Sequence, residues 1–499
     1  MKIRSLFAQS LRAQIFSGLL IAVAAVGLTS CHSAAYYYYK FPQYTYANRP
    51  VPPSKLAQRV MVSVTNAGSI GALPILDAKR DIRNNVQDTI PSFQISGGVG
   101  GYPNLILSFP AEVHGYVYSD LKGDISLVDY SKESASASAG SFSGRSTSLA
   151  IPPSGAHLYS AQQTVGQLGI IDEATNRTYG LVIPNVYRVA VNTGDTVVLA
   201  MVKNSNTIYR LFKLNDNQYQ TAALAIQATG AADCEPLNLP VYCAVAVPGN
   251  FDRPIAAYFS LDGNTAYILN CGPECGGSTA SVSFLQTGPL YVNNIPTTPV
   301  PGPSPVVSNV PVPGGATVGL SDGTTLYVAG QQQMPDGLFT GNLSTINLAD
   351  AINNPAIALT GKYGISDGNH TKLLFADDNT LWIGSQYCAT GERAKLNQNY
   401  NCLTRFDRGA KTAQIIPNVT PGSATATVPY PNTNQNLYYY GDLTGLCWVQ
   451  GFHKVYTAYG GQVHAFHTAD GSEINNQFIT VQGTALDVAY LDAIADTDN

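Results

Sequence analysis

The cysteines are the residues whose spacing points most directly to chemistry. Beyond Cys31 the sequence holds seven cysteines, and six of them form three close pairs: Cys234/Cys243, Cys271/Cys275 and Cys388/Cys402. Close pairs in turn-rich sequence predict local disulfides if the protein works in an oxidising compartment. A zinc site needs four converging ligands and no Cys-x-x-Cys occurs, although the spacing of Cys271 and Cys275 alone suits either chemistry. We predict three disulfides and a buried position for Cys447.

The histidines and carboxylates show no catalytic pattern. None of the seven histidines belongs to a GxSxG or HExxH motif. His464 and His467 are three residues apart, but the sequence around them alternates like a strand, which points the two side chains to opposite faces. Asp262, Asp322 and Asp377 recur at equivalent turns, which favours a role in shaping those turns. The sequence therefore predicts no catalytic residue, no metal site and no cofactor.

The N-terminus has the layout of a secretion signal. A positively charged start precedes the apolar run 15–28, which is shorter than the roughly 20 residues that a membrane-spanning helix needs. After this run, Leu28-Thr29-Ser30-Cys31 resembles the bacterial lipobox, in which the cysteine thiol is acylated and the chain is cut just before it. The resemblance implies lipid attachment at Cys31 and a membrane anchor of two or three acyl chains. An ordinary signal peptide or an uncleaved anchor is the alternative.

The same resemblance suggests a location and a set of boundaries. Lipoproteins with Asp after the cysteine usually stay at the inner membrane, and His32 at that position favours the outer membrane. Residues 1–30 would be the signal peptide, 31–56 the lipidated tether, 57–493 the folded part and 494–499 a tail. Tyrosines and prolines dominate the tether, and Pro-rich segments are extended spacers. A merely disordered leader fits this composition nearly as well.

Composition narrows the class of protein and of partner. Only 12% of residues are charged, the formal net charge is −5, and no basic cluster occurs, so we expect no nucleic-acid partner. High Gly, Tyr, Val and Thr content with few charges favours a β-rich extracytoplasmic protein over a helical one.

A degenerate internal repeat predicts the architecture. Alternating apolar strands, each followed or preceded by a tight polar turn, begin near Met61, Tyr116, Val197, Ala266, Leu326, Leu381 and Val455. Units of four antiparallel strands that cannot bury their faces alone predict an all-β, seven-bladed β-propeller. The strand 484–491 has no partner in its own repeat, and we assign it as the inner strand of the blade begun by residues 59–80.

Two phrases in the repeat resemble a known group of propellers. VSVTNAGSIGALPILDAKRD, from Val62, and LDGNTAYI, from Leu261, resemble the YVTN-repeat and lactonase-like propellers, which implies seven blades. The resemblance is degenerate between residues 131 and 180. The last repeat, VYTAYGGQVHAFHTADGSEI, also resembles a quinoprotein-type blade, although the chain has only two tryptophans. These resemblances imply an alternative function, a propeller enzyme acting on a lactone, sugar or quinone-linked substrate.

The distribution of long connections indicates a binding face. In a four-stranded meander, the connections after the second strand share one face, and they are long in three consecutive units: 270–279, 330–341 and 385–402. Long loops on a rigid scaffold commonly bind partners, whereas surface insertions without a role would look the same. The Pro-rich segment 293–313 should link two blades. The polar and aromatic candidates on blades four to six are Gln331, Gln332, Gln333, Tyr387, Arg393, Lys395 and Tyr400.

The sequence thus predicts a lipid-anchored propeller of the bacterial envelope that acts as a binding or scaffold module. Its expected partners are the membrane, through the acyl chains, and a protein or glycan of the envelope.

Overall fold

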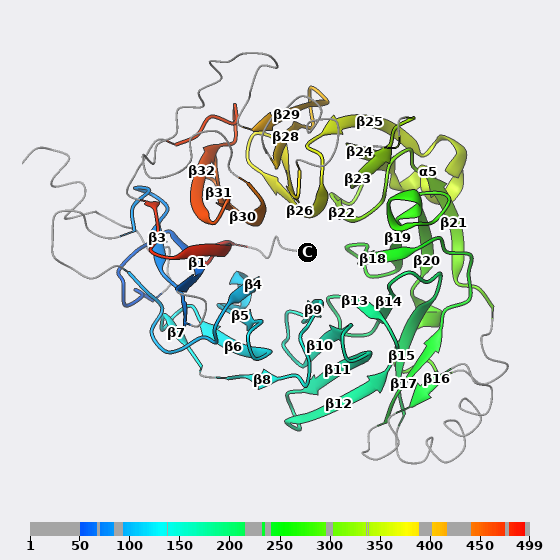
Figure 1. Cartoon of the computed structure of the whole chain (residues 1–499), viewed down its shortest axis with the longest axis horizontal. Coiled ribbons are helices and arrows are strands. Elements are labelled where there is room, and N and C mark those ends of the chain that lie inside the picture. Colours follow the sequence, from blue (N-terminus) through cyan, green and yellow to red (C-terminus); the bar gives the residue numbers. More distant parts are fainter. Residues whose placement is uncertain are drawn as a thin grey trace, which may run out of the picture.

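The computed structural model describes residues 50–66, 70–83, 93–136, 138–214, 232–234, 241–295, 303–335, 337, 339–388, 402–416, 441–474 and 479–494 of the 499-residue chain. Within these residues the strands form eight antiparallel sheets that stand radially around a central axis (Figure 1). The protein is therefore an all-β propeller with eight blades.

The first four blades follow each other along the chain. Blade 1 consists of β33 (Thr484–Tyr490), β1 (Arg59–Asn66), β2 (Ile70–Ala72) and β3 (Ile75–Asp77). Blade 2 consists of β4 (Pro103–Phe109), β5 (His114–Ser119), β6 (Asp124–Asp129), β7 (Ser134–Ala135) and β8 (Gly140–Ser141). Blade 3 consists of β9 (Ser148–Ala150), β10 (His157–Gln162), β11 (Gln167–Asp172) and β12 (Arg177–Val182). Blade 4 consists of β13 (Val186–Val191), β14 (Val198–Val202), β15 (Ile208–Leu214), β17 (Val241–Ala246) and β16 (Ala232–Cys234).

The other four blades complete the ring. Blade 5 consists of β18 (Pro254–Phe259), β19 (Thr265–Asn270), β20 (Ser281–Gln286) and β21 (Val306–Pro311). Blade 6 consists of β22 (Val318–Ser321), β23 (Thr325–Gln333), β24 (Phe339–Asn347) and β25 (Leu359–Ile365). Blade 7 consists of β26 (Asn369–Ala376), β27 (Thr380–Gln386), β28 (Leu403–Asp407) and β29 (Thr412–Ile416). Blade 8 consists of β30 (Leu443–Val449), β31 (Lys454–Tyr459) and β32 (Gln462–His467).

Helical segments within the described residues are short. They are α5 (Leu348–Asn353) and the 3-10 turns η1 (Pro110–Glu112), η3 (Gly272–Cys275), η4 (Gly288–Leu290) and η5 (Pro355–Ile357). In the part of the chain that the structure describes, no helix has the length and apolar character needed to span a membrane.

The prediction of seven blades is wrong, because blade 3 lies within the stretch that looked degenerate. Its second strand begins with His157-Leu-Tyr159. The second strands of five other blades begin in the same way, with His114-Gly-Tyr116, Thr265-Ala-Tyr267, Thr325-Leu-Tyr327, Thr380-Leu-Trp382 and Lys454-Val-Tyr456. A polar residue followed two positions later by a large aromatic is therefore a recurrent blade signal. In blade 3 the signal lies within the stretch 131–180, where the repeat is degenerate, and no Asp-Gly or Asp-Asn turn precedes it.

The predicted closure of the ring is confirmed. Strand β33, near the C-terminus, pairs antiparallel with β1, from Val60 opposite Tyr490 to Thr65 opposite Thr484. The contact is tightened at the strand ends, where the backbone N–H of Arg59 donates to Asp492 over 2.7 Å. Blade 1 is thus assembled from both ends of the chain, which leaves the ring without an open inner edge at this point.

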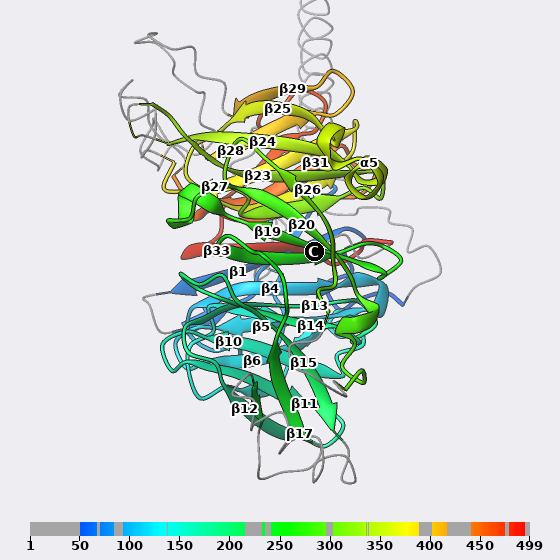
Figure 2. The same cartoon turned by 90° about the vertical axis from the view of Figure 1, so that its right-hand side faces the viewer.

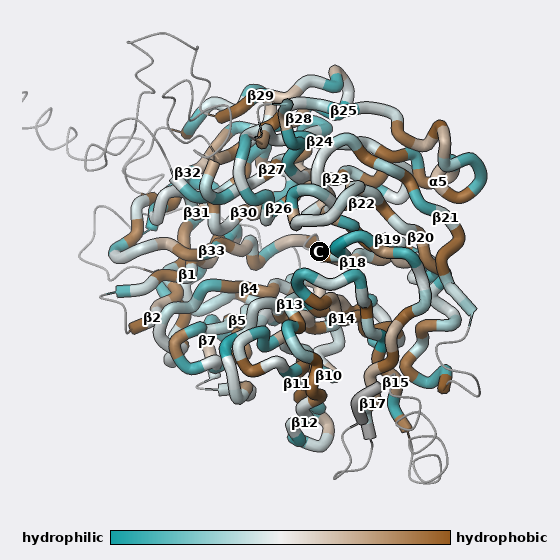
Figure 3. The backbone as a smooth tube through the Cα atoms, turned by 45° about the vertical axis from the view of Figure 1, so that its right-hand side comes forward, coloured by the Kyte–Doolittle hydropathy of each residue, from teal (hydrophilic) through white to brown (hydrophobic). Residues whose placement is uncertain are grey.

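Each gap between neighbouring blades is filled by its own hydrophobic cluster. The described residues form eight such clusters, one for each pair of neighbouring blades. Strand β23 shows how they arise: Leu326 and Val328 pack toward blade 5, whereas Tyr327 and Ala329 pack toward blade 7. Alternate residues of a strand face opposite sides of a sheet, so strands buried on both sides must be apolar throughout. Hydrophobic stretches accordingly recur around the ring (Figure 3).

The strands run between two faces of the propeller, seen edge-on in Figure 2. We call the face that carries η3, the end of the β23–β24 hairpin at Gln333 and Phe339, and the Cys388–Cys402 disulfide the disulfide face. The opposite face carries the turns 260–264, 322–324 and 377–379, and we call it the turn face. Both described ends of the folded chain, residues 50–58 and 491–494, lie at the turn face, because β33 ends there and β1 begins there.

One connection differs from the prediction. The Pro-rich segment 293–313 was expected to link two blades, but Val306–Pro311 forms β21, the outermost strand of blade 5. Proline is compatible with an edge strand, where an N–H can be missing without loss of a ladder hydrogen bond. Blades 5 and 6 are therefore connected by the short stretch 312–317, between β21 and β22.

Candidate binding face

Two of the predicted disulfides are present and lie on the disulfide face. Cys271 is bonded to Cys275, and Cys388 to Cys402. Cys243 is also disulfide-bonded, and the backbone pairs it with Cys234 across the β16–β17 ladder; the side chain of Cys234 lies outside the described residues. Cys447 is buried in the cluster between blades 8 and 1, as predicted.

The shorter disulfide loop presents a carboxylate to the neighbouring blade. Between the two cysteines, η3 places Glu274 against blade 6, where its carboxylate accepts the Gln331 backbone N–H over 2.8 Å and the Gln331 side-chain amide over 3.1 Å. A side chain at Gly315 would meet Glu274 at 1.8 Å, so the glycine is required for this approach. Burial raises the pKa of Glu274, although the two hydrogen bonds from Gln331 oppose that change.

Gln331 also forms a hydrogen bond toward blade 7. Its side-chain oxygen accepts the Gly368 N–H over 3.3 Å. Gln331 is only 9% exposed, so it joins blades and does not offer a contact surface for a partner. Gln331, Gln332 and Gln333 also belong to β23 and not to a loop, because the β23–β24 hairpin extends past its expected end, pairing Gln333 with Phe339.

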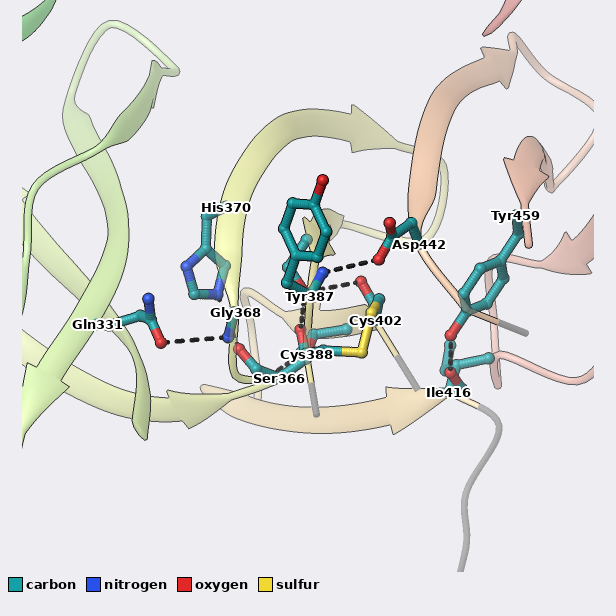
Figure 4. Close-up of a disulfide and its surroundings, with 12 residues drawn as sticks. Gln331, Ser366, Gly368, His370, Tyr387, Cys388, Cys402, Ile416, Asp442 and Tyr459 are labelled. Carbon is teal, nitrogen blue, oxygen red and sulfur yellow. Dashed lines mark hydrogen bonds between the residues drawn. A yellow bond between two sulfur atoms is a disulfide. The ribbon is translucent and has the colours of Figure 1, made fainter. Parts of the chain in front are cut away.

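The longer disulfide loop begins with a tyrosine in an unusual backbone conformation. Tyr387 has φ of +54°, in the left-handed region that non-glycine residues seldom occupy. Its N–H donates to the Asp442 carboxylate over 2.7 Å, and Cys388 follows it directly (Figure 4). On the other side, a side chain at Gly368 would come within 2.9 Å of the Cys388 backbone. The side chain of Tyr387 is nonetheless 62% exposed.

The chain of contacts also extends in the opposite direction, toward blade 4. Asp252, in the link between blades 4 and 5, accepts the backbone N–H groups of Ser278 and Thr279, each over 2.7 Å. The next residue, Arg253, donates its N–H to Asn206 over 3.1 Å. We call the resulting series the belt; from blade 4 to blade 8 it comprises Asn206, Arg253, Asp252, Ser278, Glu274, Gln331, Gly368, Tyr387 and Asp442.

Other predicted positions cannot be placed. Arg393, Lys395 and Tyr400 lie outside the described residues, as does Cys31. Of the seven binding-face candidates, the structure therefore describes Gln331, Gln332, Gln333 and Tyr387. Sequence reasoning missed Glu274 and Asp442. The Cys-Gly-Pro-Glu-Cys spacing marked the turn that carries Glu274, but nothing in that spacing indicated which neighbour its carboxylate would meet.

The turn face carries the recurrent aspartates and several histidines in structural roles. Asp322 accepts the N–H groups of Thr324 and Thr325 within its own turn, and Asp262 does the same for Asn264. Asp377 instead accepts the His453 N–H of blade 8. Asp262 and Asp322 thus shape their own turns. Asp322 also accepts a hydrogen bond from Arg408 of blade 7, so both Asp322 and Asp377 join neighbouring blades.

The predicted orientation of two histidines is confirmed. His464 is fully buried, whereas His467 is exposed, as expected for residues that point to opposite sides of a strand. His464 Nδ1 lies 2.8 Å from Glu473 Oε1. Among the described side chains, no group of three or more His, Cys, Asp or Glu could hold a metal ion.

Charged side chains on the inner strands are engaged with neighbouring blades. Lys372 on β26 lies 3.4 Å from Asp487 on β33, and Arg188 on β13 donates to the Thr317 carbonyl over 3.3 Å. Each contact passes across one intervening blade, since blade 8 separates the first pair and blade 5 the second.

No protein-family model and no curated protein sequence matches the chain. Solved structures resemble it in fold. Hydrazine synthase of Kuenenia stuttgartiensis shares 13% identity at a TM-score of 0.45, over 74% of this chain and 96% of that chain. The dihydro-heme d1 dehydrogenase NirN shares 12% at a TM-score of 0.49, over 90% of this chain and 82% of that chain. AztD from Citrobacter koseri shares 9% at 0.44, over 87% and 97%. Such distant likeness says nothing about function.

Proposed function

We propose that this propeller is a binding module of the cell envelope that recognises a protein partner through Tyr387 on its disulfide face. The observation that carries the proposal is the conformation of Tyr387, an exposed aromatic residue held at positive φ by a hydrogen bond and an adjacent disulfide. Strained backbone that the surroundings enforce is concentrated at functional sites. Tyrosine also supplies much contact area at a low cost in side-chain entropy.

The belt supports the proposal because it makes the surface around Tyr387 rigid. Hydrogen bonds connect five consecutive blades across this face, so little order would have to be gained on binding. Preorganisation of this kind raises affinity by lowering the entropic cost of association.

The position of the chain ends is consistent with a tethered binder. We propose, from the lipobox resemblance, that Cys31 carries acyl chains that anchor the protein in the outer membrane. The folded chain starts at the turn face, so a tether joined at this point starts on the side opposite the disulfide face.

Site-specific photo-cross-linking in cells tests the proposal. A photo-reactive phenylalanine replaces Tyr387 in the full-length protein, and the matched control carries it at Tyr102. Tyr102 is also exposed at positive φ and also lies on the disulfide face, but it belongs to blade 2, outside the belt. We expect a discrete protein adduct from position 387 and none from position 102.

A second variant separates the loop from the fold. Replacing Cys388 and Cys402 with Ala should remove the adduct, because loop closure by this disulfide has a stabilising effect of about 3 kcal/mol on a 15-residue loop. We expect the propeller itself to stay folded. Equal adducts from positions 387 and 102, or an adduct that survives loss of this disulfide, would refute the proposal.

The enzyme alternative receives no comparable support. It would depend on charged groups near the axis, and Lys372 and Arg188 are already directed at Asp487 and at the Thr317 carbonyl. We therefore do not propose a catalytic function.

A further inference from the structure

The two described disulfides differ in how far they are accessible. Cys388 and Cys402 are both buried, with 1% and 0% of their surface exposed. In the other pair Cys271 is fully buried, but Cys275 is partly exposed and lies between the exposed residues Pro273 and Gly276. Of the four cysteines in these two bonds, only Cys275 is not buried, so a thiolate from outside would reach the Cys271–Cys275 pair through this residue. Access to a sulfur atom is one of the factors that set the rate of thiol–disulfide exchange.

The Cys271–Cys275 bond closes a ring around a side chain that contacts the neighbouring blade. Glu274 lies inside the five-residue ring closed by this bond, and its carboxylate is pressed between Gly315 and Gln331. Burial is the largest influence on its pKa and raises it, so burial outweighs the two hydrogen bonds from Gln331. Burial therefore disfavours the charged form of this carboxylate, and the closed ring keeps it at the buried position.

We propose that Cys271–Cys275 is a thiol–disulfide exchange site through which a dithiol reductant releases the belt at Glu274. One thiolate of the dithiol attacks Cys275 Sγ, and the electron pair of the broken S–S bond leaves on Cys271 Sγ, which takes up a proton. The second thiolate then attacks the mixed disulfide at the sulfur of the dithiol, so that Cys275 leaves and is protonated. The protein disulfide gains two electrons, and the dithiol becomes a disulfide.

Opening the ring has a defined consequence for the binding face. Without the bond, η3 no longer fixes Glu274, and the carboxylate can withdraw from Gln331 into water. Gln331 then loses its two hydrogen bonds to Glu274. Its side-chain hydrogen bond from the N–H of Gly368 is no longer supported by a fixed position of the Gln331 side chain. The inference thus rests on the proposed function for its biological meaning, but the exchange site and the release of Gln331 can be measured without a partner.

The first experiment compares the two disulfides in the full-length oxidised protein. Dithiothreitol is the dithiol probe, samples are quenched with N-ethylmaleimide over time, and peptide mass spectrometry follows labelling of each cysteine. We expect Cys271 and Cys275 to be labelled at least tenfold faster than Cys388 and Cys402. Labelling of Cys388 and Cys402 at an equal or higher rate overturns the proposal.

The second experiment measures hydrogen–deuterium exchange at the Gln331 amide. Removing the bond by reduction or by Cys271→Ala with Cys275→Ala should speed this exchange about tenfold. Glu274→Ala, with the disulfide intact, should have the same effect. Unchanged Gln331 exchange after loss of the bond overturns the release step. Failure of Tyr387 to cross-link a partner would refute the proposed function while leaving both of these measurements unaffected.

Discussion

Lys372 and Asp487 meet across blade 8, joining the inner strand of blade 7 to the inner strand of blade 1. The Lys372 ammonium lies 3.4 Å from the Asp487 carboxylate, which also accepts the Ile106 N–H of blade 2 over 2.9 Å. The pair passes over Gly445 of β30, where a Cβ atom would lie 2.6 Å from Asp487 Oδ1. Burial raises the pKa of Asp487, while Lys372 and the backbone donors oppose that change. One carboxylate of blade 1 therefore binds groups of blades 7 and 2 at the point where the ring closes.

Gly445→Ala should weaken this junction. The added methyl group would also lie 2.7 Å from backbone atoms of residues 487 and 488, which cannot move without disturbing β33. We expect the free energy of unfolding to fall by about 1–3 kcal/mol, as for other overpacked positions. Denaturant unfolding measures this change. Gly364→Ala is the control, because no atom lies within 4 Å of its Cβ position; equal stability of the two variants would contradict the prediction.

Truncation before Thr484 should destabilise the whole propeller. Blade 1 would lose its inner strand, leaving the β1 backbone unpaired along six residues and opening the clusters shared with blades 8 and 2. We expect a large drop in the thermal unfolding midpoint. The control is deletion of residues 495–499 alone, which should leave the midpoint unchanged. A truncated protein as stable as this control would show that β33 is dispensable.

His370 should make stability fall in mild acid. It is fully buried, donates from Nε2 to the Ser366 carbonyl over 2.8 Å, and burial lowers its pKa to about 4. Below pH 6.5 His370 becomes protonated in the unfolded chain but stays neutral in the folded protein. The free energy of unfolding therefore decreases as the pH falls from 6.5 toward 4. The loss amounts to roughly 3 kcal/mol. His370→Gln should remove this slope in chemical unfolding measured across the range, and parallel curves for variant and wild type would exclude it.

Tyr387→Gly should separate stability from binding. Glycine adopts positive φ without strain, which stabilises the folded state by about 1 kcal/mol. The greater conformational entropy of glycine in the unfolded chain partly offsets this gain. We expect a change in the free energy of unfolding between 0 and about 1 kcal/mol in the stabilising direction, together with loss of the cross-linked partner in co-purification. Tyr102→Gly should stabilise similarly and keep the partner. Retention of the partner by Tyr387→Gly would show that the tyrosine side chain is not the contact.

Cys31→Ala should release the protein from the membrane. The cysteine thiol is the only lipid attachment point that the lipobox resemblance implies, so the variant should incorporate no labelled fatty acid. Fractionation after a high-salt wash, which removes electrostatically bound proteins, measures the remaining association. Unchanged membrane association of the variant would rule out this anchor.

Much of the fold could be predicted from the sequence, because strands buried on both sides leave a strong signal. Leu326 to Ala329 read as a continuous apolar run, and blade 1 could be closed with residues 484–491 because that strand lacked a local partner. Blade 3 was missed because its signal, His157-Leu-Tyr159, lies within the degenerate stretch 131–180 and has no marked turn before it.

The site was harder to predict, for a physical reason. The spacing of Cys271 with Cys275 and of Cys388 with Cys402 marks local bonds, which depend on nearby residues only. The contacts of Glu274 with Gln331 and of Tyr387 with Asp442 join residues 57 and 55 positions apart. Such contacts follow from the angle between blades, which no single segment encodes, and the left-handed backbone at Tyr387 likewise depends on its neighbours.

Closure of the ring by β33 has a consequence for the order of folding. Arg59 pairs with Asp492, a partner 433 residues later in the chain, so blade 1 cannot be completed until β33 has been synthesised. Contacts over such separations make folding slow. Until then β1 presents an unpaired apolar edge of the kind that promotes association between chains. The nascent protein is therefore most vulnerable to aggregation just before β33 arrives, and chaperones that shield strand edges would act in that interval.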